Sequence, residues 1–368
     1  MGKGSCGYPF EPANGDDIYM FFSQIIGQDS AKNFLKGVIS RKRIPHGYLF
    51  TGIPGIGKTS AARALTVALN CHAPLELDGC GRCPVCHQIS GGNFPDFLSV
   101  RPDGQNIRIE QVRELNRKLS FPPVSGRYRV TVIHQAATMT GEAANAFLKT
   151  LEEPPPRNIL ILTTTEPYDL LPTIVSRCQR VAFRPLAVEQ MADWLVTERD
   201  QERRMANILA RASEGSLGVA LKMVESDYLQ KRGEWLSTLT DLFTCSKADA
   251  LDMAVTATEG KNRWGLRSSE TNETGLMDML DTWETWFRDL LLIRVGGSQR
   301  LIINRDLVDQ LKSLAAGFET DNLIKALFAL DRALKDLRRM RSPALVMENA
   351  VLNLKRFAAA GSIPMGEQ

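Results

Sequence analysis

The sequence contains no apolar run of 18 residues or more, the length that a membrane-spanning helix requires. Residues 1–20 have neither the apolar segment nor the small-residue cleavage site of a signal peptide. Both observations favour an intracellular protein over a membrane-spanning or secreted one. We therefore expect a cytoplasmic location.

An excess of charge of one sign is also missing. The 45 basic and 42 acidic residues nearly cancel and leave a net charge of +3. A chain with so weak a net charge contacts nucleic acid only through a local patch, so composition does not decide whether it touches DNA. With 368 residues, 43% of them apolar, two or three domains with packed cores are expected.

Residues 1–19 are polar and rich in Gly and Pro, and Met20 stands just before the first amphipathic stretch. We expect residues 1–19 to be a disordered extension, or to precede the true start of translation at Met20.

Cysteine is scarce outside one short segment. Four of the seven cysteines form the pattern Cys71-x8-Cys80-x2-Cys83-x2-Cys86. In a reducing compartment this clustering predicts a metal site instead of disulfides. Four thiolates at such spacings are typical of a structural zinc ion, whose closed shell leaves no position for a catalytic water. An iron–sulfur cluster and a set of free thiols are the alternatives.

Short apolar runs alternate with helical patterns between residues 20 and 185. The runs cover 48–50, 96–100, 129–133 and 158–165, and they are continuously apolar. Such runs are typical of strands buried on both faces of a parallel sheet, which predicts a doubly wound α/β domain. After residues 183–186 the pattern is helical, apart from a polar stretch at 257–275 that we interpret as a long loop.

The segment "GIPGIGKT" fits the phosphate-loop pattern G-x-x-x-x-G-K-[ST] and stands between an apolar strand and a helical pattern. In such a loop backbone N–H groups and a helix N-terminus cradle phosphates, the lysine contacts them and the threonine binds Mg²⁺. We therefore expect ATP and Mg²⁺ to bind at Gly52, Gly55, Gly57, Lys58, Thr59 and Ser60.

The acidic pair that a nucleotide-hydrolysing chain carries after a buried strand is missing. After "RVTVI" the chain has His134 and Gln135 instead. Imidazole is a poor Mg²⁺ ligand, and a neutral amide cannot act as a general base. The sequence therefore predicts a chain that holds ATP without hydrolysing it.

Five segments together resemble AAA+ clamp-loader subunits of bacterial DNA polymerase III. They are "IIGQDSAKNFLKGVISRKRIPHGYLFTGIPGIGKTS", the four-cysteine module, "ANAFLKTLEEPPP", "TTTEP" and "IVSRCQRVAF". The resemblance covers about residues 20–220, and farther on the chain matches only in its helical character.

This resemblance implies an α/β AAA+ P-loop domain with a parallel sheet and a zinc module at 20–186, a small helical lid domain at 187–228 and an all-α collar at 229–368. The implied partners are the gamma/tau and delta subunits, in a ring that loads the sliding clamp on primer-template DNA. The protein would then be part of the DNA polymerase III holoenzyme.

Two departures from the family pattern distinguish the subunit types. Motor subunits of the gamma/tau type carry Asp-Glu at 134 and 135, and an arginine where this chain has Gly218 in "GSLG". Both losses favour the delta-prime type, a largely structural subunit. The alternative is an active gamma/tau-like ATPase that uses Glu152, Glu153 or Glu166. A separate AAA+ DNA-binding module would need a DNA-reading element, and we find none.

The resemblance also assigns two further site residues. Arg177 in "SRC" corresponds to the arginine that the family places on the neighbouring subunit's nucleotide, where it stabilises transition-state charge in trans. The alternative for Arg177 is an ion pair within its own domain. Thr164 corresponds to a sensor near the γ-phosphate, although three consecutive threonines leave its register open.

Overall fold

The computed structural model describes residues 21–259 and 273–358. Among these residues the chain forms two compact units. The first comprises 21–187 and 214–222, and the second comprises 188–213, 223–259 and 273–358. The predicted N-terminal extension at 1–19 lies outside the described residues. So does 260–272, the centre of the predicted polar loop, whereas the described ends of that loop, 257–259 and 273–275, are helical.

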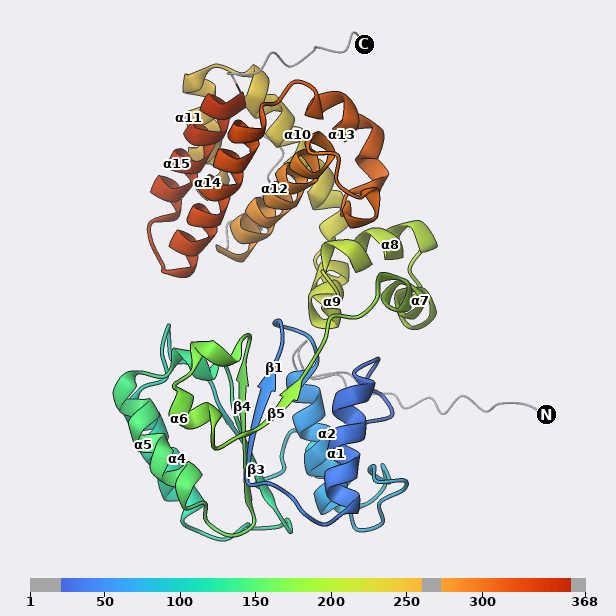
Figure 1. The fold of residues 1–368 in the computed structure, drawn as a ribbon, viewed down its shortest axis with the longest axis vertical. Helices are drawn as coiled ribbons and strands as arrows, with labels where there is room; N and C mark the ends of the chain where they lie inside the picture. The colour runs from blue at the N-terminus through green and yellow to red at the C-terminus, as the bar shows by residue number, and fades with distance from the viewer. Residues whose placement is uncertain (1–20, 260–272, 359–368) are drawn as a thin grey trace, which may run out of the picture. The chain divides into compact units, whose positions relative to one another are not determined.

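The first unit is built on one parallel sheet of five strands in the order β2-β3-β4-β1-β5 (Figure 1). The strands are β1 (Gly47–Thr51), β2 (Phe97–Val100), β3 (Arg129–Ile133), β4 (Asn158–Thr164) and β5 (Gln179–Ala182). Every residue of β1, β3 and β4 is buried, which is why their sequences are apolar or neutral apart from Arg129, whose charge is paired with the buried Asp96. The predicted α/β sheet and its four strands are confirmed.

Strand β5 was not predicted. It lies at the edge of the sheet beside β1, and only Val181 of its four residues is buried. An exposed edge strand needs no continuous apolar run, so its sequence gives no such signal.

Helices cover both faces of the sheet, with α1 and α2 on one face and α4, α5 and α6 on the other (Figure 1). The first-unit helices are α1 (Asp29–Ser40), α2 (Lys58–Asn70), α3 (Pro84–Ser90), α4 (Ile109–Leu119), α5 (Gly141–Glu152) and α6 (Pro172–Val175), with 3₁₀ turns η1 (Ala136–Thr138) and η2 (Pro167–Asp169).

Helix α5 follows the predicted pattern. Ala143, Phe147 and Leu151 are fully or almost fully buried on one face. The Thr140 hydroxyl accepts the Ala143 N–H at 3.3 Å and caps the N-terminus. The helix ends at Glu152, just before three prolines that cannot continue it.

The second unit is helical throughout its described residues. Its elements are α7 (Val188–Arg199), α8 (Arg203–Ala212), α10 (Tyr228–Thr244), α11 (Lys247–Glu259), α12 (Glu273–Arg294), η3 (Gln299–Leu301), η4 (Arg305–Leu307), α13 (Val308–Ala315), α14 (Thr320–Arg338) and α15 (Pro343–Ala358). Trp283, Trp286 and Phe287 of α12 are buried in its core. Helix α9 (Leu217–Glu225) begins in the first unit.

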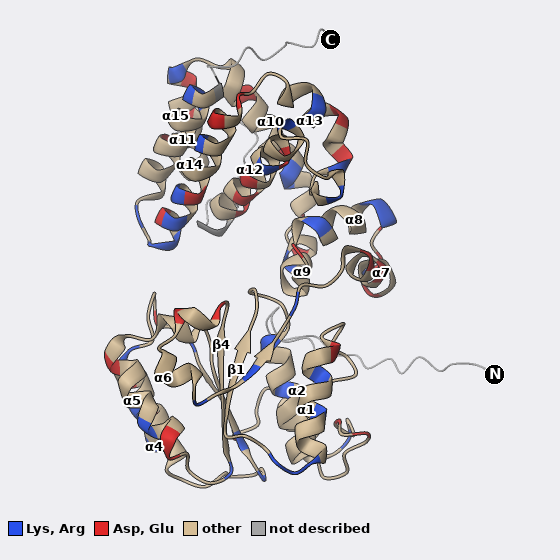
Figure 2. Cartoon of the chain, in the orientation of Figure 1, with Lys and Arg blue, Asp and Glu red and all other residues tan. Residues whose placement is uncertain are grey.

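Charged residues of both signs are interspersed over the helices (Figure 2), as the balanced composition leads us to expect. Within the described ranges no helix is both long and apolar enough to cross a membrane.

Candidate functional site

A cavity of about 480 Å³ opens at the carboxyl edge of the sheet in the first unit. This volume is within the range of sites that hold a small ligand. Its walls include the loop 54–57 with the start of α2, the residues after β2 and β3, the end of β4 with Thr165, and residues 217–222 of α9. Ligands of open α/β sheets bind at this edge, so the cavity is the candidate site.

The loop between β1 and α2 has the backbone that a phosphate cradle requires. Gly55 and Gly57 have φ values of 72° and 99°, a left-handed conformation that favours glycine. Gly57 is the N-cap of α2, so the helix begins at Lys58 and directs its free N–H groups at the cavity.

Lys58 folds over its own loop. Its ammonium group donates hydrogen bonds to the carbonyl oxygens of Gly52 and of Ile53, the latter at 2.8 Å. Partial burial lowers the pKa of Lys58 to about 8, because removing the ammonium from water disfavours its charged form. A bound phosphate would compete with the two carbonyl groups for this amine.

The start of α9 is fastened to the phosphate loop by two hydrogen bonds. The Ser216 hydroxyl donates to Pro54 O at 2.8 Å, and the Gly218 N–H donates to Gly55 O at 2.9 Å. A Cβ added at Gly218 would lie 2.9 Å from Gly55 Cα, so any side chain there would displace the loop. Gly218 thus has a packing role against the phosphate loop.

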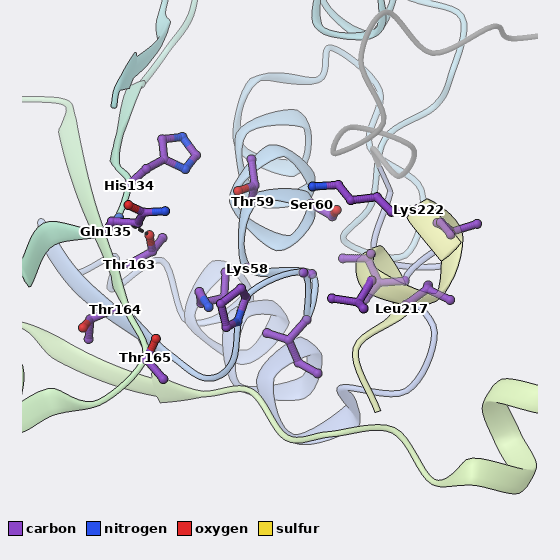
Figure 3. Close-up of a pocket in the computed structure, with 18 of the residues that line it drawn as sticks. Lys58, Thr59, Ser60, His134, Gln135, Thr163, Thr164, Thr165, Leu217 and Lys222 are labelled. Carbon is purple, nitrogen blue, oxygen red and sulfur yellow. Dashed lines mark hydrogen bonds between the residues drawn. The ribbon is translucent and has the colours of Figure 1, made fainter. Parts of the chain in front are cut away.

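His134 lines the cavity wall but is held by a neighbouring strand. It is 8% exposed, and a hydrogen bond of 2.9 Å joins its Nε2 to Ser99 Oγ. Gln135 has a φ of 48°, and its N–H donates to Thr163 Oγ1 at 3.1 Å. In Figure 3 the Gln135 side chain points toward the start of α2. The position that a water-activating carboxylate would occupy therefore carries a neutral amide.

Glu152, Glu153 and Glu166, the alternative catalytic carboxylates, do not line the cavity. Glu152 pairs with Arg177, and the backbone N–H of Glu166 donates to Asp169. Asp169 is the single carboxylate among the lining residues in the described part of the chain.

The three threonines at the carboxyl end of β4, Thr163 to Thr165, all line the cavity (Figure 3). Thr163 Oγ1 is tied to the end of β3 by its contact with Ile133 O at 3.4 Å, and Thr164 Oγ1 donates to Glu166 O at 3.1 Å. Thr165 is exposed to the cavity. The sensor role of Thr164 stays a prediction.

Arg177 lies outside this cavity, just after the short helix α6. One guanidinium nitrogen is 2.7 Å from Glu152 Oε1, and another donates to Thr173 O at 3.0 Å. The side chain is 37% exposed. Its separation from the chain's own cavity accords with a role in trans, while the pair with Glu152 is the intradomain contact weighed as the alternative.

Sequence reasoning missed two basic residues and an apolar wall of the cavity. The basic residues are Arg101, which follows β2, and Lys222 on α9. The apolar wall consists of Ile25, Ile26, Leu186, Leu217 and Leu221. These residues belong to segments far apart in the sequence, so no local motif marks them. For Lys222 the sequence does hold one signal, because the 3.6-residue helical period places it on the same helix face as Gly218.

The four predicted cysteines come together beside α2 and α3. Their sulfur atoms all lie within 4.8 Å of one another. Cys71 Sγ is 3.9 Å from Cys83 Sγ and 3.8 Å from Cys86 Sγ, and the Cys83 and Cys86 sulfurs are 3.5 Å apart. Four ligands at about 2.3 Å around a tetrahedral zinc ion have sulfur atoms about 3.8 Å apart. The donor set and its spacing therefore fit zinc.

The cysteine module is also part of the hydrophobic core. Cys71 and Cys86 are 1% exposed and pack with Val67, Val85 and Phe94. The Cys80 N–H donates to Cys71 Sγ at 3.3 Å, and the backbone N–H of Arg82 lowers the pKa of the Cys80 thiol to about 6. The N–H contact at Cys80 stabilises the thiolate, the form that binds metal, whereas burial raises the pKa of the Cys71 and Cys86 thiols.

Residues 27–187 match the family model described as "DNA polymerase III, delta subunit". The chain is 30% identical to the DNA polymerase III subunit delta′ of Bacillus subtilis (strain 168) over 331 residues, which are 89% of this chain and 96% of that protein. It is 29% identical to the tau subunit of the same organism over 350 residues, or 90% of this chain. It spans only 61% of the length of that tau subunit.

Among solved structures, a DNA polymerase III gamma subunit-related protein from Thermotoga maritima is similar. The two share 21% sequence identity with a TM-score of 0.40, over 89% of this chain and 99% of that chain.

Proposed function

Because the chain belongs to the DNA polymerase III clamp-loader subunits of the delta-prime type, we propose that it is a mainly structural AAA+ subunit that binds nucleotide without hydrolysing it. The observation that carries this proposal is the absence of a carboxylate at positions 134 and 135, where the cavity adjoins the end of β3. His134 is bound to Ser99 and offers imidazole, a poor Mg²⁺ ligand, and the neutral amide of Gln135 cannot act as a general base. Mg²⁺ and ATP would be held by Lys58 and Thr59.

The proposed partners are the gamma/tau and delta subunits, in a cytoplasmic assembly that loads the sliding clamp on primer-template DNA. Arg177 would complete the nucleotide site of a neighbouring gamma/tau subunit. Its exposure and its distance from the chain's own cavity support this role. Residues 187–228 and 229–368 would act as lid and collar, the collar joining the subunits of the ring.

We also propose that Cys71, Cys80, Cys83 and Cys86 hold a structural zinc ion. The ion would cross-link the end of α2 to α3, in addition to the apolar contacts of Val67 with Val85 and Ile89. With four thiolates around it, the zinc has no open position, so its contribution is to folding stability.

A two-part experiment tests the proposal. The full chain, tagged and purified from its own host, should bring gamma/tau and delta subunits with it. The chain alone should bind MgATP and turn it over far below the usual enzyme range. A turnover of roughly 1 per second by the isolated chain would contradict it. That result would favour the gamma/tau-like alternative, with Asp169 as the first carboxylate to replace.

A further inference from the structure

The backbone of helix α9 contacts the phosphate loop directly at Gly218. The hydrogen bond from the Gly218 N–H to Gly55 O leaves no room for a side chain at that position. The next residue on the same face is one turn farther along, at Lys222, since residues four apart are neighbours on a helix surface. Lys222 lines the cavity. In Figure 3 its side chain extends toward the start of α2, where Ser60 is labelled.

We propose that Lys222 binds the nucleotide, through the phosphate group nearest to the nucleoside. This inference rests on the proposed function, because it needs the cavity to be a nucleotide site. Lys222 would supply a positive charge from α9, which Gly218 on the same helix cannot supply.

The charges of the cavity favour an anionic ligand. Among the described residues Lys58, Arg101 and Lys222 line it, against one carboxylate, that of Asp169. A lysine ammonium is a compact charge with three donors on a flexible stem, which suits a phosphate oxygen. The side chain of Lys222 is exposed, so it can reach the ligand without displacing core residues.

The position of Lys222 identifies which phosphate it contacts. The residues around the γ-phosphate position, Gln135 and Thr163 among them, lie on the other side of the start of α2 in Figure 3. Lys222 instead lies next to Leu217 and Leu221 of the apolar wall, the part of the cavity suited to a base and ribose. A phosphate between that wall and the loop is the α-phosphate, which ATP and ADP share.

The test is equilibrium binding of MgATP and MgADP to the full chain. We expect Lys222→Gln to weaken both nucleotides by the same factor, about 10-fold for one charge-assisted contact at a partly solvated site. Lys222→Arg should restore most of the affinity for both, since it keeps the charge. Lys149→Gln removes an exposed lysine of α5 that does not line the cavity, and it should change neither affinity.

Two outcomes overturn the inference while the proposed function stands. In one, Lys222→Gln binds both nucleotides as the wild type does, while Lys58→Ala binds neither. In the other, Lys222→Gln loses ATP much more than ADP, which would place Lys222 at the γ-phosphate. If the wild type binds neither nucleotide, or if Lys58→Ala leaves affinity unchanged, both the inference and the proposed nucleotide site are wrong.

Discussion

Arg177 and Glu152 form an ion pair of 2.7 Å between the end of α5 and the loop after α6. Both side chains are well exposed, at 37% and 49%, so solvent screens the attraction and the pair contributes little to stability. A weak pair of this kind can hold Arg177 in one place in the free chain and release it when a stronger anion arrives. The phosphate of a neighbouring subunit's nucleotide is such an anion.

The pair predicts the effect of Glu152→Gln on the assembled clamp loader. The neutral side chain no longer competes for Arg177, so DNA-stimulated ATP turnover should rise, by at most about fivefold for an exposed ion pair. Glu153→Gln, a change at the next exposed carboxylate, should have no such effect. If Glu152→Gln instead lowers turnover as far as loss of the arginine does, Glu152 positions Arg177 and does not restrain it.

The four-cysteine module predicts about one zinc ion per chain, measured by elemental analysis of freshly purified protein. Cys83→Ser should remove most of the metal and lower the melting temperature, because a hydroxyl is a poor zinc ligand. Cys245→Ser, outside the module, should retain the metal in full. Iron in place of zinc, or no stoichiometric metal in the wild type, would rule the site out.

The lowered pKa of Lys58 predicts a pH dependence of nucleotide binding. A phosphate binds the charged amine, and the free chain loses that charge as pH rises through about 8. Affinity for MgATP should therefore fall between pH 8 and about pH 9.5, approaching tenfold per pH unit for one proton. Lys58→Met should bind weakly at every pH in this range. A wild-type profile as flat as that of Lys58→Met would show that Lys58 does not titrate with binding.

The buried carboxylate of Asp96, at the start of β2, predicts a large loss of stability on substitution. It is 0% exposed and accepts N–H groups of Val124, Ser125 and Gly126 at 2.7–2.8 Å, with Arg129 at 3.3 Å. Asp96→Ala leaves the buried Arg129 with backbone carbonyl acceptors but without its carboxylate, so we expect about 3–5 kcal/mol less free energy of unfolding in urea. Asp103 is exposed, so Asp103→Ala should change the free energy of unfolding by less than about 0.5 kcal/mol. An equal loss in both variants would contradict this.

Features that depend on neighbours in the sequence were predictable. The strands buried on both faces, helix α5 with Phe147 on its core face, and the cysteine cluster each leave a local pattern of residues. Contacts between distant segments leave none. The segment "RVTVIHQ" does not indicate that Ser99 forms a hydrogen bond with His134. Likewise, the motif "SRC" does not indicate that Glu152 pairs with Arg177. The place of Lys222 in the cavity depends on how α9 meets the phosphate loop, which only the folded chain defines.

We propose that this subunit completes a neighbour's ATPase site with Arg177 while hydrolysing no ATP itself. The direct test is ATP turnover of a loader reconstituted from this chain with gamma/tau, delta, sliding clamp and primed DNA. It compares the wild type with Arg177→Ala, and with Arg180→Ala as an exposed control on β5.

Arginine fingers are worth roughly 10³ to 10⁵ in rate, but one of several sites is affected, so the net fall should be smaller. Arg177→Lys should not restore turnover, because lysine lacks the planar fork that grips phosphate oxygens. We expect Arg177→Ala to enter the complex in normal amount and to lower turnover, whereas Arg180→Ala should change neither assembly nor turnover. An Arg177→Ala loader that fails to assemble, or that assembles and hydrolyses ATP at the wild-type rate, would contradict it.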